Sequence, residues 1–197
     1  ATCYLDCKRN PGARTSSPLN WLLCGKTVPN QTARVSIVST NLFLDELREL
    51  YDGELLGEAF FERLLQNFDN TEWQYKLTTA LQLETETKAR LRPYLFHAGI
   101  QLNENGQARS AGLELAMSFD GLSWVATMKK LVDILEPAVN RYKHILASAP
   151  PNYRELASDM LVHEESLLAF VELELKGKGD SSVTAITAQL EHKIYPQ

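Results

Sequence analysis

The sequence predicts an all-α protein, an antiparallel four-helix bundle with an irregular N-terminal arm and a short C-terminal helix. Apolar residues recur at helical spacing over most of the chain, and strand-like alternation is nearly absent after residue 38. Residues that form turns and end helices divide the periodic region into four long segments joined by modest connections, as an antiparallel bundle requires. With 197 residues, 44% of them hydrophobic, the chain is expected to close one globular core, which we assign to residues 41–180.

Residues 1–40 differ from the rest and are expected to form a basic, irregular arm, either packed on the bundle or solvated. They contain several prolines and glycines, no helical period, and one short β-like run at 35–38. All three cysteines, Cys3, Cys7 and Cys24, lie in this arm at spacings that match neither a zinc knuckle nor a disulfide framework. This cysteine usage favours a reducing compartment.

The first long helix is expected over residues 41–68, after Ser39 as a cap. Asn70 lies in a polar turn and would cap the second helix, over residues 72–92. Pro93 is expected to kink or end that helix because proline lacks the backbone N–H that a helix interior uses. A loop rich in glycine and asparagine then leads to the third segment.

The third helical segment, residues 107–147, is expected to be interrupted near Gly121 and bent at Pro137. Two consecutive prolines precede the last long helix, over residues 152–175, and two glycines follow it. Residues 181–197 are expected to form a C-terminal tail or a short helix with apolar residues facing inward.

Four glutamates occupy helix positions that usually carry leucine. At about 100° per residue they share a stripe with apolar neighbours on three different helices. An ionised carboxylate is costly to bury unless it is paired or binds a metal. The pattern therefore predicts a polar site inside the bundle, built from Glu54, Glu58, Glu84 and Glu164.

Each of these residues also has a plainer explanation. Glu84 and Lys88 are four residues apart, in the favourable order for an ion pair within one helix. A helix break at Gly53 or Gly57 would turn the glutamates that follow toward solvent. His163 lies at the flank of an apolar stripe, where a histidine is often a hydrogen-bonded boundary residue.

The arrangement resembles the ferritin-like superfamily, whose di-iron and di-manganese members use one Glu from each of two helices and a Glu-x-x-His pair from each of the other two. The resemblance covers roughly residues 41–176 and rests on architecture. It implies a metal site formed by Glu58 (or Glu54), Glu84, His163 and Glu164.

The chain departs from the ligand pattern of that superfamily at several positions. Thr87 stands three residues after Glu84, where the pattern has a histidine, and Met160 stands three residues before His163, where it has a glutamate. The third helical segment offers only two acidic candidates, Glu114 and Asp120.

The resemblance implies an iron- or manganese-dependent oxidoreductase or oxygenase acting on a small organic substrate. Carboxylate oxygens with an imidazole suit these metals better than copper. Without a metal, a buried Glu of raised pKa would act as general acid or base, with Lys88 or His163 as catalytic partner. The alternative class is a non-catalytic bundle for dimerisation or partner binding, in which the inward acids are ion-paired.

Several other functions are not expected. No nucleophile elbow, Walker or Rossmann glycine pattern, or HExxH motif is found. Residues 42–197 carry 15 basic and 24 acidic side chains, a net charge of −9, which argues against nucleic-acid binding. No apolar run approaches the roughly 20 residues that would cross a bilayer, so no membrane partner is expected. We expect a cytoplasmic protein, with homodimerisation left open.

Overall fold

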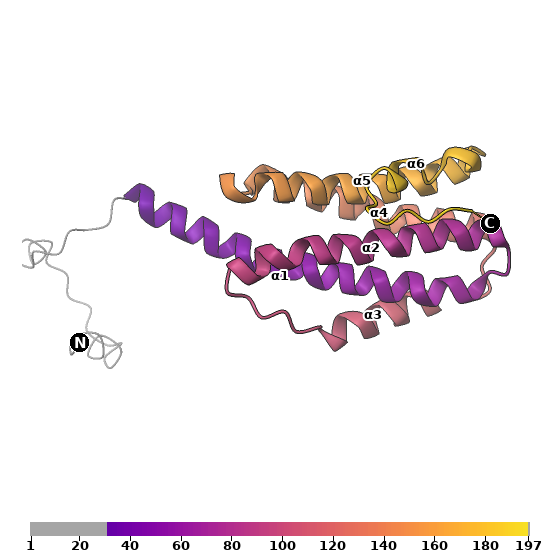
Figure 1. Ribbon diagram of the computed structural model, residues 1–197, viewed down its shortest axis with the longest axis horizontal. Coiled ribbons are helices and arrows are strands. Elements are labelled where there is room, and N and C mark those ends of the chain that lie inside the picture. The colour runs from indigo at the N-terminus through magenta and orange to yellow at the C-terminus, as the bar shows by residue number, and fades with distance from the viewer. Residues whose placement is uncertain (1–30, 197) are drawn as a thin grey trace, which may run out of the picture. The chain divides into compact units, whose positions relative to one another are not determined.

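The computed structural model describes residues 31–196, with side chains described from Phe43 onward, and it is helical without a β-strand in that range (Figure 1). The chain divides into two units, Ala1–Ser36 and Ile37–Gln197, and the second unit is described below. The elements of the described residues are α1 (Gln31–Leu64), a 3₁₀ turn (Leu65–Asn67), α2 (Thr71–His97), α3 (Gly106–Met117), α4 (Trp124–Ser148), a 3₁₀ turn (Pro151–Tyr153), α5 (Arg154–Leu175), a 3₁₀ turn (Gly179–Ser181) and α6 (Thr184–Thr187).

The first helix begins at Gln31, earlier than the sequence predicts, so the prediction of a β-like run at 35–38 is wrong. β-branched residues cost only a few tenths of a kcal/mol each in a helix, and extending an existing helix is easier than starting one. The remainder of the expected arm, with its three cysteines, lies outside the described residues.

The cap expected at Asn70 is confirmed, since its side chain accepts a hydrogen bond from the backbone N–H of Trp73 at 3.0 Å. α2 continues past Pro93 for one more turn. The expected interruption of the third segment is also confirmed. α3 ends at Met117, Gly121 adopts a φ of +74° that favours glycine, and Ser123 caps α4.

In the C-terminal region, where residues 181–197 are expected to form a tail or a short helix, the structure has a 3₁₀ turn and then only the four-residue α6. The apolar residues expected to face inward, Val183, Ile186 and Leu190, are buried. Beyond α6 the chain runs beside α2, where the Glu86 carboxylate accepts hydrogen bonds from two consecutive backbone N–H groups of this segment (Figure 1).

α1 and α2 lie side by side and antiparallel (Figure 1). Thr85 of α2 donates to Glu58 of α1 at 2.8 Å, and Arg92 of α2 donates to the Tyr51 hydroxyl of α1 at 3.4 Å. Residue numbers rise along one helix as they fall along the other. Side-chain hydrogen bonds join three further pairs of helices. Arg141 of α4 donates to Glu46 and Glu49 of α1. Thr87 of α2 hydrogen-bonds to His163 of α5, and Trp124 of α4 donates to Glu174 of α5.

α3 packs closely on α1 at Gly112. A Cβ atom at this position would collide with the Leu56 backbone oxygen and would lie 3.1 Å from the Ala59 Cβ. A glycine is therefore needed for the two backbones to approach this closely.

Two clusters of buried apolar side chains lie on either side of a polar layer. Along α1, Leu55 belongs to one cluster and Phe60 to the other. α2 and α5 show the same division, with Leu83 separated from Leu91 and Met160 separated from Leu167. Glu58 of α1, Glu84, Thr87 and Lys88 of α2, and His163 and Glu164 of α5 fall between these apolar stretches. Glu54 lies at their edge, one residue before Leu55.

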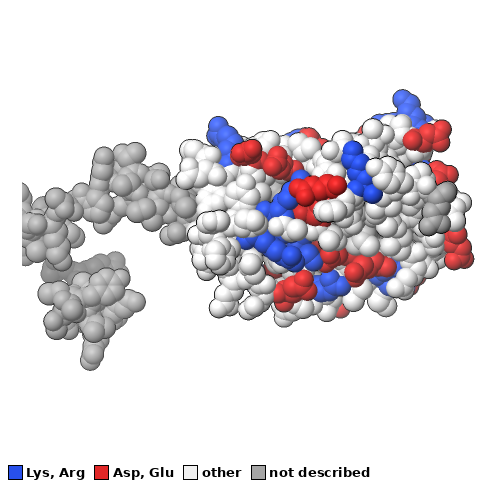
Figure 2. Space-filling model, in the orientation of Figure 1, with Lys and Arg blue, Asp and Glu red and all other residues white. Residues whose placement is uncertain are grey.

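The face drawn in Figure 2 carries Lys and Arg side chains interspersed with Asp and Glu. None of the helices in the described part of the chain combines the length and apolar character needed to cross a membrane.

Candidate metal centre

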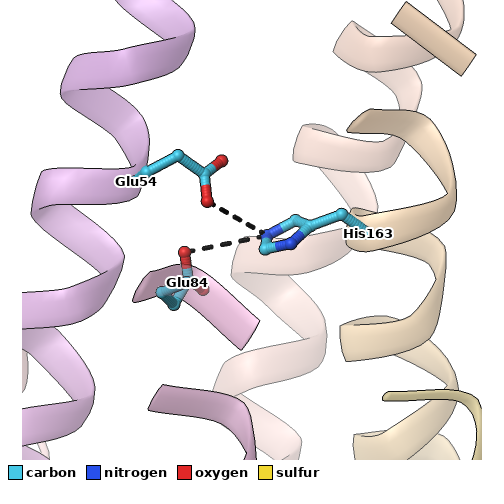
Figure 3. A group of neighbouring side chains, drawn as sticks. All are labelled: Glu54, Glu84 and His163. Atoms are coloured by element: carbon cyan, nitrogen blue, oxygen red, sulfur yellow. Dashed lines mark ion pairs between the residues drawn. The ribbon is translucent and has the colours of Figure 1, made fainter. Parts of the chain in front are cut away.

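Glu54 of α1, Glu84 of α2 and His163 of α5 converge inside the polar layer, and both carboxylates point toward the imidazole ring (Figure 3). The Nε2 atom of His163 lies 3.7 Å from Glu54 Oε2 and 3.7 Å from Glu84 Oε2. One ligand atom from each of the three residues lies within 4.8 Å of the others. All three side chains are buried, with at most 5% of their surface exposed.

Gly57 of α1 provides the space for the Glu84 carboxylate. A Cβ atom at Gly57 would overlap Glu84 Oε2 and would lie 2.8 Å from Glu84 Oε1. α1 continues unbroken through Gly53 and Gly57, so the prediction that a break could turn Glu54 toward solvent is wrong. The helix accepts the two glycines because burial of its apolar face, rather than intrinsic propensity, stabilises it.

No Lys or Arg side chain is in contact with either of the two carboxylates in the described part of the chain. Among the described residues, no Lys or Arg nitrogen lies within 4.0 Å of a carboxylate oxygen of Glu54 or Glu84. Glu54 Oε2 is buried and has no hydrogen-bond partner. By contrast, Glu174, whose side chain is 7% exposed, lies 2.7 Å from the Lys76 ammonium and is therefore paired. An uncompensated pair of buried carboxylates requires a positive charge or protonation.

The second nitrogen of His163 is held by a hydrogen-bond chain from α2. His163 Nδ1 lies 3.0 Å from the Thr87 hydroxyl, which accepts a hydrogen bond from Arg90 at 2.8 Å. When Nδ1 carries the proton and donates to Thr87, the lone pair of Nε2 faces the two carboxylates. Thr87 therefore orients the ring, as the outer partners of metal-binding histidines do.

Burial shifts the pKa values of all three residues. Burial, reinforced by the Glu84 charge, raises the pKa of Glu54 well above its ordinary value. Burial and the Glu164 charge raise the pKa of Glu84. Burial and the positive charge of Arg90 lower the pKa of His163 to about 3. The imidazole is consequently neutral at neutral pH, which is the protonation state that binds metal.

Glu164 lies next to the centre without joining the group of three. Burial raises the pKa of its carboxyl group to about 7, and the nearby Tyr142 hydroxyl of α4 and the positive charge of Arg141 act in the opposite direction. Burial also raises the pKa of Tyr142. Glu54, Glu84, Glu164 and Tyr142 all line one cavity of about 370 Å³ between the helices.

Glu58 and Lys88 form a separate ion pair. Lys88 contacts the Glu58 carboxylate, and Arg109 of α3 donates to the same carboxylate at 3.2 Å. Burial works in the opposite direction, but hydrogen bonds from Lys88 and Thr85 lower the pKa of Glu58. The structure thus places Glu54 at the centre and gives Glu58 a compensating charge, and Lys88 does not make the expected pair with Glu84.

The two acidic candidates of the third helical segment lie on the surface. Glu114 of α3 is exposed, and exposed Asp120 accepts a hydrogen bond from Arg63 at 2.7 Å. Neither residue reaches the centre, which draws its ligand atoms from α1, α2 and α5 alone.

The residues at the centre could hold a single metal ion. Bonds of about 2.1 Å place two ligand atoms of one ion about 3.0–4.2 Å apart. The two separations from His163 Nε2 are 3.7 Å and lie in that range, and all three ligand atoms lie within 4.8 Å of one another. Two carboxylates balance the charge of a divalent ion, and a neutral imidazole completes a donor set that suits iron or manganese. The Glu54 Oε2 atom, which has no hydrogen-bond partner, would gain one if an ion were bound.

Sequence reasoning did not identify Thr87, Arg90 and Tyr142 as parts of the site. In the sequence, Thr87 stands out only as the position that lacks a histidine, and Tyr142 is one residue of the third helical segment with no motif around it. The hydroxyl groups of both residues were the available signal, because a buried hydroxyl needs a hydrogen-bond partner.

Comparison of the chain with protein-family models, curated proteins and solved structures finds no match.

Proposed function

We propose that the protein is an iron- or manganese-dependent oxidoreductase or oxygenase that acts on a small organic substrate. The observation that carries this proposal is the convergence of Glu54, Glu84 and His163, buried and without a Lys or Arg partner. Buried acids of a non-catalytic bundle are expected to be ion-paired, as Glu58 is. The acids at the centre are not.

We also propose that α1, α2, α4 and α5 form an antiparallel four-helix bundle of ferritin-like type. The four pairwise contacts between these helices support the arrangement. Such bundles take metal ligands from facing helices. Thr87 occupies the position of an expected histidine and supports His163 instead, so the proposed centre holds one ion.

The protein's own residues define what happens around the centre. Glu54, Glu84 and His163 hold the ion, and Thr87 fixes the ring of His163. The apolar clusters on either side keep water away from the polar layer. The 370 Å³ cavity gives a small molecule access to Glu54 and Glu84. A bound iron or manganese ion supplies the capacity to activate dioxygen or peroxide.

Metal analysis of purified protein tests this function. After anaerobic loading with Fe(II) or Mn(II) and removal of free metal, mass spectrometry is expected to find about one ion per chain. Glu54→Gln and Glu84→Gln remove charge with little change of shape, and each should lower metal affinity by at least about 100-fold. Fe(II)-loaded parent protein should also consume dioxygen faster than free Fe(II).

Two further variants serve as controls for the metal analysis. Glu58→Gln changes an acid that already has a cationic partner, and Glu114→Gln changes an exposed acid. Both should retain the ion. A parent protein that binds neither metal, or full metal content in both centre variants, would contradict the proposal.

Removing the Thr87 hydroxyl should weaken the centre without removing a ligand. Thr87→Val is isosteric and leaves His163 Nδ1 without its partner, so we expect metal affinity to fall roughly 10–100-fold. Thr79→Val is the matched control, because buried Thr79 on the same helix bonds only to the Tyr75 carbonyl oxygen. Competition with a fluorescent chelator measures both affinities, and equal affinities would show that Thr87 does not position His163.

A further inference from the structure

The cavity beside the centre has apolar walls and one polar end. Its apolar lining includes Phe60, Phe61, Leu131, Leu135 and Leu167, from α1, α4 and α5. A volume of about 370 Å³ lies toward the small end of the range for ligand pockets. The cavity therefore suits a small molecule with an apolar body.

The polar end of this cavity is acidic. Glu84, Glu164 and the Tyr142 hydroxyl line it. Arg141 is the only Lys or Arg among the lining residues, and its guanidinium is bound to Glu46 and Glu49 at 3.0 and 2.6 Å. The cavity thus offers its occupant negative charge with little that would attract an anion.

Glu164 is the acid of this cavity that the proposed metal centre does not use. Its side chain is buried, with 9% of its surface exposed, and among the described residues no Lys or Arg nitrogen lies within 4.0 Å of its carboxylate. The nearby Tyr142 hydroxyl carries no charge, and the positive charge of Arg141 acts on Glu164 only from beyond 4.0 Å. A buried carboxylate that lacks a cation favours a ligand that brings one.

We propose that the cavity binds a small organic amine, with its ammonium group at Glu164 and Tyr142 and its apolar body against the phenylalanine and leucine side chains. Anions are excluded because the acids at the polar end would repel them. The inference rests on the proposed function only in assigning Glu54 and Glu84 to the metal, and it names the substrate class of the same site.

Three probes with the same aromatic body test the charge preference: benzylamine, benzyl alcohol and benzoate. Isothermal titration calorimetry is run on chelator-treated protein and on Mn(II)-loaded protein. We expect benzylamine to bind at least 10-fold more tightly than benzyl alcohol, and benzoate to show no binding. Equal or tighter binding of benzoate would overturn the proposal.

Matched variants locate the binding site. Glu164→Gln should weaken benzylamine binding at least 10-fold and leave benzyl alcohol binding unchanged. Glu165→Gln changes the next, exposed residue of α5 and should bind benzylamine as the parent does. Unchanged benzylamine binding in Glu164→Gln would overturn the assignment.

Metal content separates this inference from the proposed function. The protein could take up no metal and still bind benzylamine in a way that depends on Glu164. This outcome would support the amine site and contradict the proposed metal centre. One bound metal ion without benzylamine binding would overturn the amine site alone. A second bound ion that is lost in Glu164→Gln would make Glu164 a metal ligand and would also overturn it.

Discussion

Replacing His163 with glutamine should make the metal-free protein markedly more resistant to acid. The pKa of His163 is lowered to about 3 in the folded protein, against an ordinary value of 6.5. Below pH 6.5 the unfolded chain therefore binds a proton at His163, whereas the folded protein does not. The free energy of unfolding consequently decreases as the pH falls from 6.5 toward 3. At pH 4 this costs the parent about 3 kcal/mol, at 1.36 kcal/mol per pKa unit.

Urea unfolding of chelator-treated protein at pH 7 and pH 4 measures this difference. The groups that face His163 are Glu54 and Glu84, with Arg90 beyond Thr87, and all of them remain in the variant. The quantity compared is the free energy of unfolding of His163→Gln minus that of the parent. We expect this difference to be about 3 kcal/mol larger at pH 4 than at pH 7. Exposed His144 on α4 gives the control variant His144→Gln, which should follow the parent. The same relative stability of His163→Gln at both pH values would refute the prediction.

Adding one methyl group at Gly57 should abolish tight metal binding while leaving the fold intact. The new Cβ would overlap the end of the Glu84 side chain, which is flexible enough to move aside. α1 itself should gain up to about 1 kcal/mol, since alanine is a better helix former than glycine. With Glu84 displaced, we expect the affinity of Gly57→Ala for Mn(II) to fall at least about 100-fold.

Gly53 lies one turn earlier on the same helix and provides the control for Gly57. A Cβ atom there would meet only the Tyr142 hydroxyl, at 3.8 Å, which is an ordinary contact. Gly53→Ala should therefore gain helix stability and keep the parent's affinity for Mn(II). Chelator competition gives the affinities and thermal unfolding gives the stabilities. Parent-like affinity in Gly57→Ala would show that the space beside Gly57 is not needed by the centre.

Helix periodicity was sufficient to predict which acids are inside. Glu54, Glu58, Glu84 and Glu164 are all buried, and the described chain is all-helical as predicted. This part was predictable because a helix of 3.6 residues per turn assigns each residue a direction from its position alone. The interruption at Gly121 and the cap at Asn70 follow similarly from local chemistry.

Periodicity does not predict which of the buried glutamates lie together at the centre. Glu54 and Glu58 are four residues apart and face the same way, so sequence alone treats them as equivalent. The alignment between helices separates them, because Lys88 of α2 and Arg109 of α3 reach Glu58, whereas His163 of α5 reaches Glu54. Such contacts depend on how far one helix is shifted along another, which a single sequence does not show.

His163 of the proposed metal centre and Glu164 of the cavity are consecutive residues of α5. Because of this adjacency, binding at the centre and binding in the cavity are thermodynamically linked. Successive helical residues point about 100° apart, so one turn of α5 presents His163 to Thr87 and Glu164 to Tyr142. A rotation of this helix moves both groups together. Any occupant of the cavity that shifts α5 changes the affinity of the centre for its ion, and by reciprocity the ion changes the affinity for the occupant by the same factor.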